Sequence, residues 1–98
     1  MTAVQEQGKR GYHKARRAME IQKLKFKIGQ IEEDIADLKR AMGLELYEPL
    51  RDAQDEEVQE IFSKWEKRVQ EKRKEKVDAE RLLFDLEAQE ARTSNAST

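Results

Sequence analysis

The sequence contains no cysteine, so it can form no disulfide bond and offers no thiolate for metal binding or nucleophilic attack. Absence of cysteine is typical of intracellular proteins, and a cytoplasmic location is the default expectation. Residues 1–11 lack the apolar stretch of a secretory signal peptide. No part of the chain approaches the roughly 18 consecutive apolar residues that a membrane-spanning helix needs. We therefore expect neither secretion nor membrane insertion.

Helix-breaking residues and apolar residues are both scarce. One proline and four glycines leave few positions at which a helix would be interrupted. Only 37% of the residues are hydrophobic while 42% are charged, which is too polar for an ordinary compact core. The 20 Lys+Arg and 21 Asp+Glu residues nearly cancel, so charge repulsion does not force disorder. This composition favours long helices or a coiled coil, in which a narrow apolar seam suffices.

Residues suited to catalysis or metal binding are also few. His13 is the only histidine, which excludes a two-histidine zinc helix. A catalytic triad is implausible, because two of the three serines, Ser94 and Ser97, lie in the predicted C-terminal tail. No glycine-rich phosphate loop is present. Two carboxylate clusters, at residues 32–37 and 52–60, do not follow the calcium-loop pattern and fit solvated helix faces. We expect no enzymatic activity, no metal or other cofactor, and no small-molecule substrate.

The clearest pattern in the chain lies in residues 12–42. Large apolar side chains recur there at alternating intervals of three and four residues, at Ile21, Leu24, Ile28, Ile31, Ile35 and Leu38. This seven-residue repeat keeps the side chains on one stripe of a supercoiling helix. The spacing therefore predicts a helix over residues 12–42 whose apolar seam packs against another helix.

A turn is predicted after this stripe. Gly43 follows the last periodic residue, Met42, as a helix-capping glycine commonly does. Pro49, the only proline, disfavours helix at the residue before it and is well suited to the first turn of a new helix. We thus expect a turn at residues 43–48 and a second helix over residues 49–91. Residues 1–11 and 92–98 carry no apolar period and are expected to be flexible tails.

The second helix has a weaker repeat. A series with the same spacing places Phe62, Trp65, Val69, Leu83 and Leu86 in its seam. Lys72 and Lys76 fall at seam positions between the two apolar ends. Folding the second helix back on the first gives an all-α antiparallel hairpin, or coiled coil. Because each seam residue of a two-helix pair stays half exposed, we expect oligomerisation or a partner helix to complete the structure.

The charges are unevenly distributed along the chain. Residues 1–27 contain eight basic and two acidic residues, whereas residues 28–62 contain three basic and eleven acidic residues. We interpret the chain as a non-enzymatic coiled-coil module for protein–protein interaction, acting as an adaptor, scaffold or assembly subunit. Its basic arm, which we define as residues 9–27, is expected to meet an acidic surface of a second copy or of another helical protein.

An alternative uses the same basic arm differently. Its cationic side chains could bind phosphate groups of nucleic acid or of an anionic membrane, with strong salt dependence. The residues assigned to that role are Lys9, Arg10, Lys14, Arg16, Arg17 and Lys23. No motif in the sequence identifies a protein family, because heptad repeats occur in many unrelated proteins.

Overall fold

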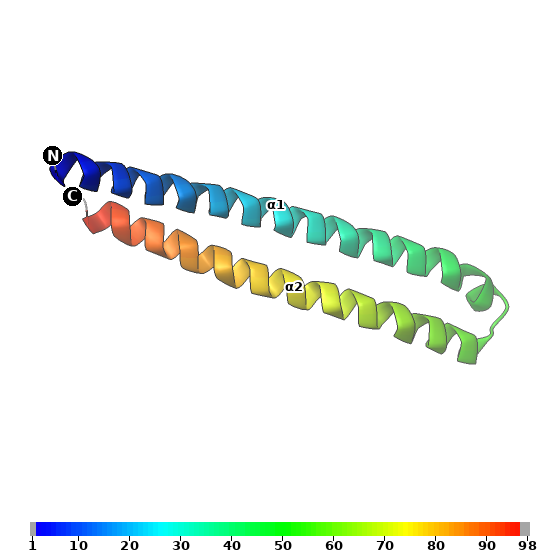
Figure 1. The fold of residues 1–98 in the computed structure, drawn as a ribbon. Coiled ribbons are helices and arrows are strands. Elements are labelled where there is room, and N and C mark those ends of the chain that lie inside the picture. Colours follow the sequence, from blue (N-terminus) through cyan, green and yellow to red (C-terminus); the bar gives the residue numbers. More distant parts are fainter. Residues whose placement is uncertain (1, 97–98) are drawn as a thin grey trace. The chain divides into compact units, whose positions relative to one another are not determined.

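The computed structural model describes the backbone of residues 2–96 and the side chains of residues 13–92. Two long helices account for nearly all of this region: α1 spans Thr2–Arg51 and α2 spans Asp55–Ala96 (Figure 1). No strand occurs within residues 2–96. The prediction of an all-α helical hairpin is confirmed.

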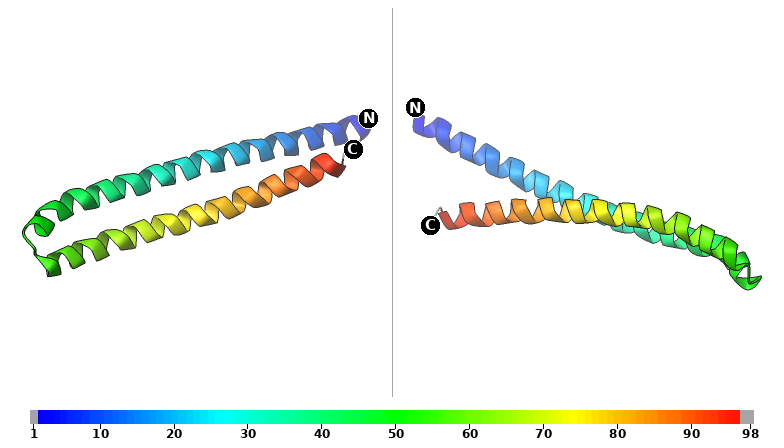
Figure 2. Two further views of the ribbon diagram at one scale, coloured as in Figure 1. Left: turned by 180° about the vertical axis from the view of Figure 1, so that it is seen from behind. Right: turned by 90° about the horizontal axis from the view of Figure 1, so that it is seen from below.

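The chain divides into two compact units. Unit 2 consists of Gly29–Asp78 and contains the end of α1, the turn and the start of α2. Its two helix segments run in opposite directions on either side of the turn (Figures 1 and 2). Unit 1 combines Met1–Ile28 with Ala79–Thr98. An ion pair links its two segments, with Lys25 Nζ lying 3.9 Å from a carboxylate oxygen of Glu87.

The buried apolar side chains lie at seam spacing in both units. In unit 1 they are Ile21 and Ala79, and in unit 2 they are Ile31, Leu46, Ile61 and Val69. Val69 is the most completely buried, at 1% exposure. No polar or charged side chain among residues 13–92 is buried. The core of each unit is therefore a narrow apolar line, as expected for a pair of packed helices.

Helix α1 does not end at Gly43, and the predicted turn at residues 43–48 is corrected to residues 52–54. Leu46 and Pro49 are buried, and they continue the covered side of α1 beyond Met42. Burial of these two side chains outweighs the cost of about 1 kcal/mol that a glycine imposes inside a helix. Pro49 lies in the last turn of α1, where its missing N–H leaves only the Glu45 carbonyl without its helical donor.

The end of α1 is closed by a Schellman motif. Ala53 adopts a left-handed conformation with φ of 54°. The N–H of Gln54 donates to the Pro49 carbonyl at 2.9 Å, and the N–H of Ala53 donates to the Leu50 carbonyl at 3.2 Å. These are the two hydrogen bonds that define the motif, in which glycine usually occupies the left-handed position. Here alanine takes that position, so no glycine marks the true turn in the sequence.

Helix α2 begins at Asp55, six residues later than predicted. The carbonyl of Gln54 accepts the first helical hydrogen bond, from the N–H of Val58 at 3.0 Å. Asp55, Glu56 and Glu57 fill the first turn, where carboxylates interact favourably with the positive end of the helix dipole. This acidic run places the start of α2 after the turn rather than at Pro49.

The helices also include segments that the sequence analysis assigned to tails. Residues 2–11 belong to α1, and residues 92–96 belong to α2. Neither segment contains proline, so no residue in them blocks continuation of the helix. Met1 and residues 97–98 lie outside the described region. In the part of the chain searched, neither helix is long and apolar enough to cross a membrane.

Candidate functional site

The seam predicted on α1 lies on the covered side of that helix. Ile21 and Ile31 are buried, and the other four predicted positions are partly buried: Leu24, Ile28, Ile35 and Leu38. The regular three-four spacing thus located the packing face of α1 along its whole predicted length. Their assignment as partner-binding residues remains a prediction, since within each unit they face the other helix of the same chain.

The seam predicted on α2 needs one correction. Val69 is buried, while Trp65, Leu83 and Leu86 are partly buried. Phe62, however, is 47% exposed, and its neighbour Ile61 is buried with 8% exposure. The seam near the turn therefore runs through Ile61 rather than Phe62.

A local change in helical repeat explains the exchange of Phe62 for Ile61. From Trp65 onward the covered positions of α2 follow the heptad. Nearer the turn the covered positions are Val58 and Ile61, so the series from the turn reads Val58, Ile61, Trp65 and Val69. These intervals of three, four and four residues make an eleven-residue repeat, which suits a helix without left-handed supercoiling. On α1, residues 38, 42, 46 and 49 likewise span eleven residues. Both helices thus leave the heptad pattern beside the turn.

Two seam lysines reach across to carboxylates on α1. Lys72 Nζ lies 3.5 Å from Asp34 Oδ2, and Lys76 Nζ lies 3.1 Å from Glu32 Oε1. Both lysine side chains are about one-third exposed, so their stems cover the seam while their ammonium groups reach solvent. The acidic run at residues 32–34, interpreted from sequence as a solvated face, therefore supplies partners for the charged middle of α2.

Neighbouring carboxylates shift the pKa of Lys72 upward. The largest contribution comes from the negative charge of Glu75, one turn along α2, with a further contribution from Asp34 across the helix pair. Partial desolvation opposes both. The charged form of Lys72 is consequently held in place from two helices, which favours one alignment of α1 and α2 in unit 2.

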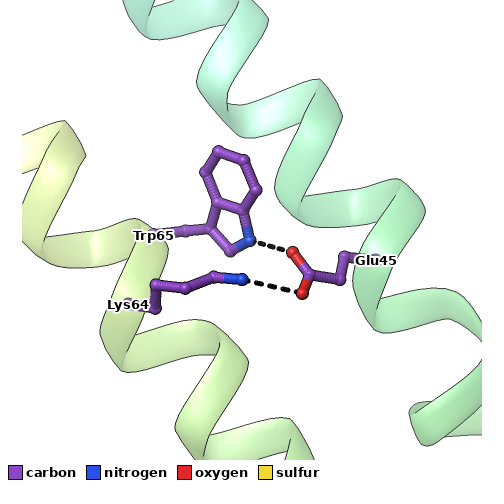
Figure 3. Close-up of polar contacts among 3 residues, drawn as sticks. All are labelled: Glu45, Lys64 and Trp65. Atoms are coloured by element: carbon purple, nitrogen blue, oxygen red, sulfur yellow. Dashed lines mark hydrogen bonds and ion pairs between the residues drawn. The ribbon is translucent and has the colours of Figure 1, made fainter.

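A second polar cluster joins the helices near the turn (Figure 3). Glu45 on α1 accepts hydrogen bonds from Lys64 Nζ at 2.8 Å and from Trp65 Nε1 at 2.5 Å, each on a different carboxylate oxygen. The Trp65 ring also has the guanidinium of Arg68 4.8 Å from its centroid, within cation–π range. Trp65 thereby packs its ring in the seam while its N–H is satisfied by a carboxylate.

These contacts lower the pKa of Glu45. The hydrogen bond from Lys64 is the largest cause and the hydrogen bond from Trp65 the second, while partial desolvation acts in the opposite direction. Both donors bind the ionised carboxylate more strongly than the neutral acid. The cluster therefore holds the two helices of unit 2 together through polar contacts. Its pairing of Glu45 with Trp65 was not predicted, because Glu45 lay in the predicted turn.

Of the described residues assigned to anion binding, Arg16 and Lys23 line one shallow surface depression, whereas Lys14 and Arg17 do not line it. Lys14, Arg16 and Lys23 are exposed on α1, and Arg17 is partly buried. Arg16 Nε lies 3.5 Å from Glu20 on the same helix. The side chains of Lys9 and Arg10 lie outside the described residues. The four described cations are thus placed along one helix rather than converging on a single point.

Large apolar side chains remain exposed on the outer sides of the helices. Unit 1 exposes Met19, Phe26, Leu82 and Phe84, and unit 2 exposes Leu44, Tyr47, Leu50, Phe62 and Val77. Phe26, Leu44 and Phe84 are each at least 70% exposed. Leu44, Tyr47 and Leu50 succeed one another at intervals of three residues, so they form one row on the surface of α1. Leu44, Tyr47 and Leu50 are therefore exposed as a group rather than singly.

Among the described residues, no group of three or more His, Cys, Asp or Glu side chains is arranged to hold a metal ion. Comparison with protein-family models, with curated proteins and with solved structures found no match to this chain.

Proposed function

We propose that this chain is a helical-hairpin module for protein–protein association, acting as an adaptor, scaffold or assembly subunit rather than as an enzyme. In this role the internal seam holds α1 and α2 together within each unit. The outer surfaces of the same helices then bind a further helical surface. A partner is thus recognised by coiled-coil-like packing of apolar side chains, with charged residues around them setting its orientation.

The observation that carries this proposal is the exposure of Phe26, Phe84 and Leu44, at 70%, 73% and 82% respectively. Aromatic and large aliphatic side chains are enriched in the centres of protein interfaces, because burying them against a partner removes much apolar area from water. A chain in which only 37% of residues are hydrophobic nevertheless leaves these three in solvent. Leu44 belongs to the exposed row with Tyr47 and Leu50 on α1, and a row of exposed apolar side chains favours an interaction surface.

Site-specific photo-crosslinking tests the proposal. Benzoylphenylalanine would replace Phe84 or Phe26 in the full chain, and crosslinked products would be identified by mass spectrometry in cells that express it. Lys74, an exposed polar residue of α2, is the matched control position. We expect crosslinks from positions 84 and 26 to a helical protein, either a second copy or another chain, and few from position 74. Crosslinks restricted to lipid or nucleic acid, or none above the control, would overturn the proposal.

A second candidate function is binding of nucleic acid or an anionic membrane through the basic arm. It is supported by the exposure of Lys14, Arg16 and Lys23 along α1. Each phosphate contact would make binding weaker as salt rises. Binding of duplex DNA, RNA and anionic vesicles at two salt concentrations, with and without the Arg16→Glu and Arg17→Glu changes, tests it. Absence of salt-dependent binding to all three ligands would dispose of this alternative.

A further inference from the structure

Two surfaces of this chain have opposite net charge, and both carry exposed apolar side chains. The first is the described part of the basic arm, residues 13–27, which carries six basic residues and one acidic residue. The second, which we name the acidic end, comprises residues 44–62 and carries seven acidic residues and one basic residue. Opposite net charge together with exposed apolar side chains is the combination that complementary interfaces use.

The basic arm presents its apolar and basic side chains on one stripe. Arg16, Met19, Lys23 and Phe26 follow one another at intervals of three, four and three residues, and all four are exposed. This is the spacing of a coiled-coil contact, but it runs along a different side of α1 from Ile21, Leu24 and Ile28. Arg16, Met19 and Lys23, with Ala15 and Glu20, line a shallow surface depression. α1 therefore carries a second stripe in unit 1 that α2 does not cover.

The acidic end offers the complementary arrangement. Its exposed apolar side chains are Leu44, Tyr47, Leu50 and Phe62, contributed by both helices of unit 2. The same residue range carries exposed carboxylates, including Glu48 on α1 and Glu60 on α2. Gln54, Asp55, Glu56, Glu57 and Glu60 line a second shallow surface depression. A basic apolar helix can thus bury its apolar side chains here while its cations meet carboxylates.

From this complementarity we propose that the chain forms a two-fold symmetric dimer, in which the basic arm of each copy packs on the acidic end of the other. The inference rests on the proposed association function and names its partner as a second copy. Pairing arm with arm would instead place like charges together, at considerable cost. Two-fold symmetry allows the same favourable contact to form twice and closes the assembly at two copies.

Sedimentation equilibrium of the full purified chain gives the first test. We expect twice the monomer mass of 11.6 kDa at low salt, with dissociation as salt rises, because exposed charge pairs are screened. A monomer at every concentration and salt would overturn the proposal. Assemblies that continue to grow beyond two copies would overturn the two-fold closure.

Charge reversal tests the orientation of the copies. The Lys23→Glu/Lys27→Glu variant reverses two charges of the arm, and the Glu48→Lys/Glu60→Lys variant reverses two charges of the acidic end. We expect each variant alone to dimerise at least about a hundredfold more weakly, since the net charge of the arm falls from +5 to +1, or that of the acidic end from −6 to −2. An equimolar mixture should restore the dimer as a heterodimer. Failure of the mixture to associate would overturn the proposed pairing, and circular dichroism of each variant establishes that both remain helical.

A matched control separates this pairing from a general effect of net charge. The Arg73→Glu/Lys74→Glu variant makes the same change in net charge as the arm variant, but at exposed positions of α2 outside both surfaces. It should dimerise like the unmodified chain, and a loss equal to that of the arm variant would contradict the assignment. A purified chain that stays monomeric while positions 26 and 84 crosslink to another helical protein would overturn the dimer and leave the proposed function standing.

Discussion

The indole N–H of Trp65 on α2 donates a hydrogen bond to Glu45 on α1, twenty residues earlier in the chain. The same carboxylate accepts a hydrogen bond from Lys64, so one acidic side chain fastens two neighbouring residues of the opposite helix. The pKa of Glu45 is lowered in the folded protein from its ordinary value of 4.5, chiefly by these two hydrogen bonds. Its carboxylate therefore stabilises the fold above about pH 4.5, and this stability is lost as the pH falls through the lowered pKa.

Replacing Glu45 by Gln should remove this pH dependence. Glutamine keeps a side-chain oxygen that can accept a hydrogen bond from Trp65, but it carries no charge for Lys64. We expect the melting temperature of Glu45→Gln to be lower than that of the unmodified chain at pH 7, with the difference shrinking towards pH 3. Glu33, exposed on the same helix, provides the control in Glu33→Gln. An equal difference at pH 7 and pH 3 would show that the charge of Glu45 is unimportant.

The adjacent residues Ile61 and Phe62 test the corrected seam. Truncating a buried isoleucine to alanine costs about 2–5 kcal/mol, because apolar contacts are lost and a cavity remains. Ile61→Ala should therefore destabilise strongly, whereas Phe62→Ala should cost about 1 kcal/mol or less, since Phe62 is half exposed. Urea denaturation followed by circular dichroism compares the two, at a low protein concentration and high salt where the proposed dimer dissociates. If Phe62→Ala destabilised the protein more than Ile61→Ala, the seam through Phe62 predicted from the sequence would be correct.

The position of the turn predicts that two opposite substitutions, Gly43→Ala and Ala53→Gly, both stabilise the protein. Gly43 lies within α1, and a Cβ atom added there would meet nothing within 4 Å. Gly43→Ala should therefore stabilise the protein by about 0.5–1 kcal/mol. Ala53 adopts a left-handed backbone that glycine occupies without strain, so Ala53→Gly should also stabilise, by up to about 1 kcal/mol. Thermal unfolding of both variants would detect the two gains. Destabilisation by Gly43→Ala would mean that the chain turns at Gly43 after all.

The seam lysines make a different kind of prediction. Changing Lys72 and Lys76 together to Leu would extend the apolar seam of α2 between Val69 and Ala79. Leucine buries more apolar surface, and Asp34 and Glu32 are exposed enough to regain hydration, so the melting temperature should rise. The alignment of α1 and α2 should become less specific, because the charge pairs that favour one alignment are removed. Sedimentation velocity should reveal additional assemblies, and a lower melting temperature with one unchanged species would refute the prediction.

Sequence reasoning located the helices and most of the α1 seam because three-four spacing is a direct consequence of helix geometry. It misplaced the turn, since Gly43 and Pro49 are strong local signals and the burial of Leu46 and Pro49 is a tertiary effect. The left-handed position fell on Ala53, a residue with no preference for that conformation. Helix-capping preferences therefore do not predict a turn at Ala53.

The candidate site was predicted less completely than the fold. The seam lysines were recognised as a break in the apolar pattern, but their partners Asp34 and Glu32 depend on how α1 and α2 are aligned. That alignment follows from the position of the turn, so the error at Gly43 carried over to the pairing of charges. The same error left Glu45 in a loop. Phe62 was placed in the seam for another reason, because the heptad spacing was extended to a part of α2 that departs from it. Cross-helix pairs of this kind become predictable only once the turn is known to the residue.

Gln54 serves both helices at once, since its N–H closes the end of α1 and its carbonyl opens α2. The connection at residues 52–54 therefore contains no residue beyond those needed to end α1 and begin α2. Deleting even one residue from Asp52 to Gln54 would remove the hydrogen bonds that close the end of α1 and open the start of α2. It would also rotate every later side chain of α2 by about 100° around the helix axis. Apolar residues would then point to water and charged ones inward, which makes this short bend the part of the chain least able to tolerate a change in length.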